Sequence, residues 1–226
     1  MGPSRKSRHS SGARRAMLTA EAVLEAAARV LAHDGYDGLT MRAIADELGV
    51  QAPALYWYFG DKRALELALF EHLMEGFAAQ VVGRDWQDQL RHGAQQLRSY
   101  LRSLRDITRL SPQGLWAGPK ALSQVEVSLG ILRGAGLSPR DAAYALNMLT
   151  SFVFQWASAE AAEADFSAER AEFLASAANA PSDPARYPNL AATQEFLLRW
   201  DPDGHFAFRL DAMIAGLEAR IGADRS

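Results

Sequence analysis

The feature that most constrains this chain is residues 39–59, where a glycine separates two runs of apolar residues at helical spacing. Ala45 is a small residue within the first run, Gly49 follows its end, and Pro53 opens the second run. Two helices that cross near a right angle through a short turn need a small residue at their contact and a glycine at the bend. Proline fits the first turn of a helix. The spacing therefore predicts a helix-turn-helix whose second helix spans about residues 52–59.

Large aromatic side chains occupy the side of this second helix that faces away from the predicted core. Leu55 and Phe59 account for its buried side. Exposed rings are poorly suited to a surface that meets only water, whereas a DNA groove offers phosphate to a phenol and thymine methyl groups to an indole. We therefore expect a DNA-binding surface, with core packing as the alternative for each ring and most of all for Tyr58. Its predicted members are Gln51, Ala54, Tyr56, Trp57 and Tyr58, with Lys62 beside them.

Charge is unevenly distributed along the chain. The net charge is −3, yet residues 1–17 hold five basic side chains and no acidic one, and the remainder holds 19 basic and 27 acidic side chains. A basic arm attached to an acidic body favours polyanions. We expect the arm, residues 1–17, to be disordered in the free protein. It is either a solubilising tail or an accessory contact to DNA phosphate or to the minor groove.

After the arm, apolar residues recur at helical spacing almost throughout, and no alternating strand pattern exceeds a few residues. The pattern predicts an all-α fold. We expect a three-helix helix-turn-helix domain over residues 18–62 and a larger helical domain over residues 63–226. A helix over residues 61–82, capped by Asp61, is predicted to connect them. Thr19 and Thr40 are the expected caps of the first two helices. Further helices are predicted over about 86–110, 121–134, 138–162, 193–200 and 205–221.

Two of these helices carry more apolar surface than one subunit can bury. The helix over residues 138–162 is apolar around nearly its whole circumference, and the last helix presents Phe206, Leu210 and Ile214 at helical spacing. A helix that is apolar all round must be buried on more than one side. Two such helices from each of two subunits can form a four-helix bundle across a two-fold axis. The sequence therefore predicts a homodimer.

The composition excludes several classes of function. The chain has no cysteine, which rules out disulfides, thiolate zinc sites and cysteine nucleophiles. None of its five histidines lies in an HExxH motif, and the chain has no glycine-rich phosphate loop. We expect no enzyme activity, cofactor, metal or membrane span, and a cytoplasmic location. A helical enzyme and a ligand-independent architectural DNA-binding protein are the alternatives.

Residues 18–77 resemble the DNA-binding domain of the tetracycline-repressor (TetR) family of bacterial transcription regulators. The resemblance rests on G-x-T-x-R-x-I-A-x-x-L-G-V over residues 38–50 and L-Y-x-Y-F-x-x-K over residues 55–62. A weaker similarity to the ligand-binding and dimerisation domain of tetracycline repressors continues over residues 123–152 and the last helix. It implies an all-α homodimer whose two recognition helices enter successive major grooves of a palindrome. A small molecule in the second domain then releases the DNA through the helix that connects the domains.

The resemblance also assigns roles to individual residues of the first domain. It makes Arg42 a contact to base or phosphate and Lys62 a contact to phosphate. Ala52 and Ala54 stand where tetracycline repressors carry a base-reading glutamine and a phosphate-binding threonine. We therefore expect a different operator, with Arg42, Gln51 and the arm as the main sources of specificity. The implied DNA-binding residues are Thr40, Arg42, Gln51, Pro53, Tyr56, Trp57, Tyr58 and Lys62.

The second domain departs further from tetracycline repressors. Residues 110–120 lack the histidine that binds the magnesium–drug chelate, and Gly93, Leu97 and Ser128 replace three pocket residues. We therefore do not expect tetracycline as the ligand. A sizeable and mostly apolar molecule, such as an aromatic or polyketide-like compound held by few hydrogen bonds, is expected instead. The predicted pocket residues, for each of which core packing is the alternative, are Leu97, Tyr100, Leu101, Trp116, Asn147, Ser151, Phe152 and Gln155.

Overall fold

The computed structural model describes residues 18–110, 119–179, 184–199 and 201–223, and within these ranges it contains helices and loops but no strand. The predicted all-α fold is confirmed. The basic arm and Trp116 lie outside the described residues. The helices are α1 (Ala20–Gly38), α2 (Met41–Leu48), the 3-10 helix η1 (Ala52–Trp57), α3 (Lys62–Met74), α4 (Trp86–Ser103), α5 (Ile107–Leu110), α6 (Pro119–Ala135), α7 (Pro139–Asn179), α8 (Pro188–Leu198) and α9 (Pro202–Ala223).

Local capping determines where the first helices begin and end. Thr19, Thr40 and Asp61 each accept a hydrogen bond from the backbone N–H three residues further on, and they cap α1, α2 and α3. Gly49 ends α2 with a φ of 66°, which glycine adopts without the strain that a side chain would cause. The three predicted caps and the glycine turn are confirmed.

The helix-turn-helix is present, but its second helix differs from the prediction. Ala45 is buried at the contact between the helices, and Leu55 and Phe59 are buried as expected. The second helix is a 3-10 helix that ends at Trp57, whereas the apolar spacing predicts a helix through Phe59. Pro53 has no backbone N–H, and the turns here close with i to i+3 bonds such as Tyr58 N–H to the Leu55 carbonyl (3.0 Å).

The predicted connecting helix over residues 61–82 is wrong in its second half, because α3 ends at Met74. The Tyr100 hydroxyl donates a hydrogen bond to the Leu73 carbonyl (2.5 Å), an oxygen in the last turn of α3. The same hydroxyl occupies the space that a Cβ on Gly76 would need. Residues 77–83, here called the strap, continue without helical structure toward α4.

The predicted helix over residues 86–110 is also interrupted. α4 ends at Ser103 and α5 begins at Ile107, with Asp106 between them at a φ of 54°. The Asp106 carboxylate accepts a hydrogen bond from the backbone N–H of Tyr36 (2.8 Å), and Arg105 donates to the carbonyl of His33 (2.6 Å). The chain leaves the helix here to join the end of α1, and this contact links the first helices to the rest of the molecule.

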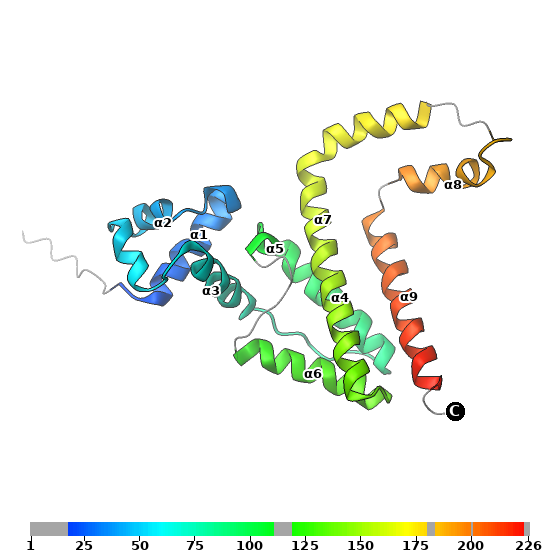
Figure 1. The fold of residues 1–226 in the computed structure, drawn as a ribbon, viewed down its shortest axis with the longest axis horizontal. Helices are drawn as coiled ribbons and strands as arrows, with labels where there is room; N and C mark the ends of the chain where they lie inside the picture. The colour runs from blue at the N-terminus through cyan, green and yellow to red at the C-terminus, as the bar shows by residue number, and fades with distance from the viewer. Residues whose placement is uncertain (1–17, 111–118, 180–183, 200, 224–226) are drawn as a thin grey trace, which may run out of the picture.

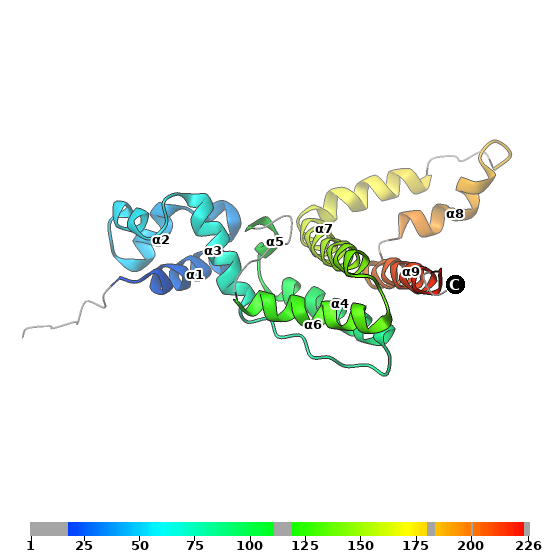
Figure 2. The same ribbon diagram turned by 60° about the horizontal axis from the view of Figure 1, so that its bottom comes forward.

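The long helix α7 organises the second half of the molecule. It packs against α4, α5, α6, α8 and α9, and it continues past the predicted end at residue 162 to Asn179. The added residues are rich in alanine and glutamate, which favour helix. Figures 1 and 2 show α1, α2 and α3 at one end of the molecule and α7 and α9 at the other. No helix in the described ranges is long and apolar enough to cross a membrane.

A buried ion pair joins α4, α7 and α9. The Arg98 guanidinium donates to both oxygens of Glu160 (3.0 and 2.5 Å), lies 2.8 Å from an Asp203 oxygen, and stacks 4.5 Å from the Phe206 ring centroid. The hydrogen bond to Glu160 holds the pKa of Arg98 above its usual value, against the opposite effect of burial. The buried pair of Arg98 and Glu160 thus joins α4 to α7, and the contacts of Arg98 with Asp203 and Phe206 attach α9 to them.

Candidate DNA-binding surface and effector cavity

The exposed end of the helix-turn-helix carries the predicted aromatic side chains. Trp57 is 90% exposed and Tyr56 is 50% exposed, so neither ring belongs to the core. Tyr58 is 41% exposed, and its hydroxyl donates a hydrogen bond to the Leu18 carbonyl (2.5 Å). This bond ties the residue at which the basic arm joins the body to the aromatic cluster. We call Gln51, Tyr56, Trp57 and Tyr58 the recognition surface.

The other predicted DNA-binding residues flank the recognition surface. Thr40, Arg42 and Pro53 are exposed, and all lie on or next to α2 and η1 at the end of the molecule farthest from α9 (Figure 1). The Arg42 side chain is 89% exposed, with Nε 3.8 Å from an Asp46 oxygen. A surface ion pair of this length is weak, which leaves the guanidinium available to a phosphate or a base. The Thr40 hydroxyl already caps α2.

Lys62 is held at the start of α3 by groups of its own subunit. Its ammonium lies 3.6 Å from a Glu66 oxygen and 5.0 Å from the centroid of the Tyr36 ring. The hydrogen bond to Glu66, together with partial burial, raises the pKa of Tyr36, so that phenol stays neutral. The Lys62 side chain is still 45% exposed, so its ammonium is accessible from solvent. Its contact with DNA phosphate, like those of the other seven residues, stays a prediction.

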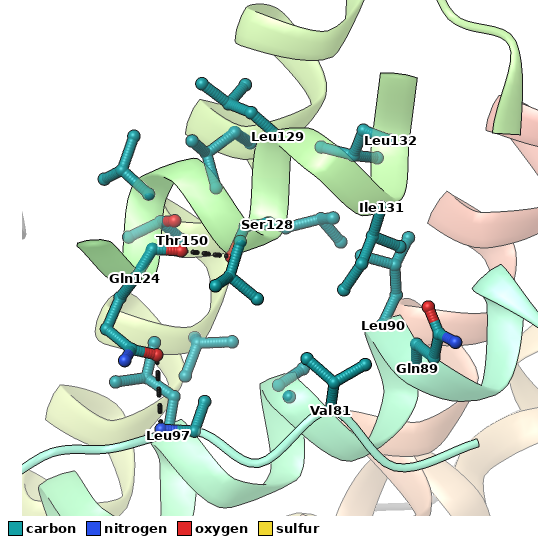
Figure 3. Close-up of a pocket in the computed structure, with 18 of the residues that line it drawn as sticks. Val81, Gln89, Leu90, Leu97, Gln124, Ser128, Leu129, Ile131, Leu132 and Thr150 are labelled. Atoms are coloured by element: carbon teal, nitrogen blue, oxygen red, sulfur yellow. Dashed lines mark hydrogen bonds between the residues drawn. The ribbon is translucent and has the colours of Figure 1, made fainter. Parts of the chain in front are cut away.

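A cavity of about 380 Å³ lies between the strap, α4, α6 and α7. Figure 3 shows Val81 on the strap pointing toward α6 across this space. Most of the lining is aliphatic, with Leu90 and Leu97 from α4 and Ile131 and Leu132 from α6. This is the composition expected of a site for a small, largely apolar molecule.

Glutamine side chains hold the strap in place over the cavity. Gln96 on α4 binds Gln80 twice, since its Oε1 accepts from the backbone N–H (2.8 Å) and its Nε2 donates to the carbonyl (3.1 Å). Gln124 on α6 accepts from the backbone N–H of Ala79 (3.2 Å), and its own carbonyl accepts from the Ser128 hydroxyl (3.0 Å; Figure 3). The bonds to Ala79 and Gln80 satisfy backbone groups of the strap, which has no helical hydrogen bonds.

Two family models match the chain. "Bacterial regulatory proteins, tetR family" covers residues 23–69, and "Tetracyclin repressor-like, C-terminal domain" covers residues 82–221. Tetracycline repressor protein class C from Escherichia coli is 35% identical over 205 residues, which are 89% of this chain and 91% of that protein. The chain belongs to the tetracycline-repressor family. Regulators of this family bind operator DNA and small-molecule ligands, and they dimerise.

Solved structures of family members share the fold. ActR from Streptomyces coelicolor in complex with actinorhodin is 25% identical, with a TM-score of 0.82 over 92% of this chain and 100% of that chain. A TetR variant from Acinetobacter baumannii AYE in complex with minocycline is 28% identical, with a TM-score of 0.66 over 90% and 98% of the two chains. Ligand binding is thus recorded in two relatives of this tetracycline-repressor family member.

The cavity of this family member brings together some of the predicted pocket residues and leaves out others. Leu97, Asn147 and Ser151 line it, while Trp116 lies outside the described residues. Four predicted residues are not part of the lining. Tyr100 binds Leu73, Leu101 is buried in the core, Phe152 packs 5.0 Å from the Phe206 ring, and Gln155 is exposed.

Sequence reasoning missed the strap and most of α6 as walls of the cavity. Val81, Gln124 and Val127 all contribute to the lining. The apolar spacing predicts one continuous helix over residues 61–82, and this prediction excludes a non-helical segment that could wall a cavity. The alignment of Ser128 with a pocket glutamine of tetracycline repressors was the available signal for α6, and Ser128 does line the cavity.

Proposed function

We propose that this protein is a dimeric transcriptional repressor that leaves a palindromic operator when a small, largely apolar molecule fills its cavity. One observation carries the proposal. The chain carries exposed aromatic side chains at the end of its helix-turn-helix, and it also contains an apolar cavity. The two are directly connected, because α3 leads from the helix-turn-helix into the strap, which forms one wall of the cavity. Its site of action would be the cytoplasm, where the operator is.

In this proposal residues 18–62 bind DNA, and residues 63–226 bind the effector and dimerise. Two copies of η1 enter successive major grooves, where Tyr56 and Trp57 contact backbone and base edges. The dimer forms through α7 and α9, on which Tyr144 (66% exposed) and Phe208 (76% exposed) present large apolar surface in the single subunit.

The cavity favours a ligand-responsive regulator over a ligand-independent architectural DNA-binding protein. A protein that only shapes DNA needs no internal space, and protein interiors otherwise close-pack around their side chains. A repressor that an effector releases from DNA must also bind that effector more tightly without DNA, because the coupling between two ligands is reciprocal.

The DNA-binding half of the proposal is tested with Tyr56→Ala and Lys62→Ala, using a DNA fragment that the purified protein retains from the genome of its source. Each substitution is expected to weaken binding about tenfold or more. Loss of the Lys62 contact to phosphate should also reduce the slope of log affinity against log salt by about 0.9. Fluorescence anisotropy at several salt concentrations measures both quantities.

The matched control is Tyr187→Ala, which removes an exposed tyrosine next to α8, far from the recognition surface. It should leave DNA affinity unchanged, and thermal unfolding should show that all three variants fold. Wild-type affinity in both Tyr56→Ala and Lys62→Ala would remove the recognition surface from the account.

A further inference from the structure

We infer that the effector is an uncharged molecule that binds without a metal ion, an inference that rests on the proposed function because it names the ligand of that same cavity. Of the 23 described residues that line the cavity, none has an ionisable side chain. The segment outside the description at 111–118 contains no ionisable side chain in its sequence either. The lining therefore offers an ionic ligand no opposite charge.

Three arginines on the helices that wall the cavity are bound to other groups of the chain. On α4, Arg91 lies 2.7 Å from an Asp211 oxygen on α9, and Arg98 is buried with Glu160. On α6, Arg133 donates to the carbonyl of Leu137. A carboxylate in the cavity would have to break one of these contacts to pair with any of these three arginines. An unpaired charge in apolar surroundings is strongly disfavoured.

A metal chelate is disfavoured by the donor set. Proteins hold hard divalent cations with carboxylate oxygens and hold softer ones with imidazole or thiolate. The lining has none of these groups. Across the described part of the chain, no three His, Cys, Asp or Glu residues gather as a possible metal site. A drug that must arrive with magnesium would find neutral amide and hydroxyl oxygens here, but no carboxylate or imidazole to hold the ion.

The polar groups that do line the cavity suit carbonyl and hydroxyl groups. Amides and hydroxyls both donate and accept hydrogen bonds, so they pair with ketones, quinones and phenols without a charge. Together with the aliphatic majority of the lining, they define the ligand class as an uncharged apolar frame with carbonyl or hydroxyl substituents. These polar residues are Gln80, Gln89, Gln124, Ser128, Asn147, Thr150 and Ser151.

The test compares two probes that differ by one charge, 1,8-dihydroxyanthraquinone and its 3-carboxylic acid. Isothermal titration of the full-length protein at pH 6.5 keeps the phenols neutral and the carboxylic acid ionised. The uncharged probe should bind at least about 30-fold more tightly than the carboxylate, because the latter buries an unpaired charge. Added magnesium or EDTA should leave the affinity for the uncharged probe unchanged.

Two variants test whether the difference in affinity between the probes arises in the cavity. Val127 lines it at a position that is 40% exposed, so a longer side chain there does not disturb the core. Val127→Lys should raise the affinity for the carboxylate about tenfold by supplying the missing cation, and the control Val127→Met should not.

Three results would overturn the inference: equal affinity for the two probes, a requirement for magnesium, and no binding of either probe. Each of these would leave the proposed regulator standing as long as the protein still retains its DNA fragment. Loss of selective DNA retention is a separate result, and it would overturn the proposed function itself.

Discussion

Trp57 is 90% exposed while Leu55, two residues earlier, is fully buried. The 3-10 geometry of η1 explains this contrast, because residues three apart lie on the same side of such a helix and residues two apart do not. Tyr58 lies three residues after Leu55, on the buried side. It is accordingly the least exposed of the three aromatic residues and uses its hydroxyl within the protein. Core packing is the alternative that the sequence analysis gives for Tyr58, and the structure supports it in part, because the Tyr58 ring is partly covered and its hydroxyl is bonded within the protein.

Asp37 gives a residue-scale prediction with a defined pH dependence. Arg109 donates two hydrogen bonds to its carboxylate (3.1 and 2.7 Å), and these hold the pKa of Asp37 below its ordinary value. The pair therefore stabilises the fold above the unfolded pKa of about 3.9, and this contribution is lost as the pH falls through the lower folded pKa.

Asp37→Asn should consequently unfold at lower urea concentration than the wild type at pH 7.5. The difference should shrink progressively as the pH is lowered below about 4. Urea titrations followed by circular dichroism measure it. A difference of the same size at every pH would show that the Arg109 pair does not cause it.

At the scale of helices, the sequence predicts beginnings better than ends. Thr19, Thr40 and Asp61 cap helices through bonds only three residues long, so a local pattern is sufficient. The ends of α3 and α4 depend on distant partners. Tyr100 reaches Leu73 across 27 positions, and Asp106 reaches Tyr36 across 70. Apolar periodicity contains no information about such contacts, and for this reason the strap and its share of the cavity could not be predicted.

The strap gives a prediction at this scale. Gln96→Ala removes both side-chain bonds to Gln80, so the amide of Gln80 should exchange with deuterium about tenfold faster. Hydrogen-exchange mass spectrometry of peptides over residues 77–83 measures the change. Gln95→Ala, at an exposed neighbouring position, is the control. Wild-type protection in Gln96→Ala would mean that packing alone holds the strap.

At the scale of the whole molecule, the recognition surface and the cavity lie in different parts of the chain and are connected through α3 and the strap. The hydrogen bonds of Arg105, Asp106 and Arg109 with the end of α1, the last of them an ion pair with Asp37, provide a second connection between the parts. An effector that moves the walls of the cavity can therefore displace the helix-turn-helix. In a dimer, the same displacement changes the distance between two recognition surfaces, on which binding to a two-fold DNA site depends.

The most direct test of this account is a footprint of the protein on a DNA fragment that it retains from its source genome. We expect two protected half-sites, related by two-fold symmetry, with centres about one helical turn or a multiple of it apart. Both should disappear together in Trp57→Ala. A footprint without two-fold symmetry, or one that Trp57→Ala leaves intact, would contradict the claim that paired aromatic surfaces bind the operator.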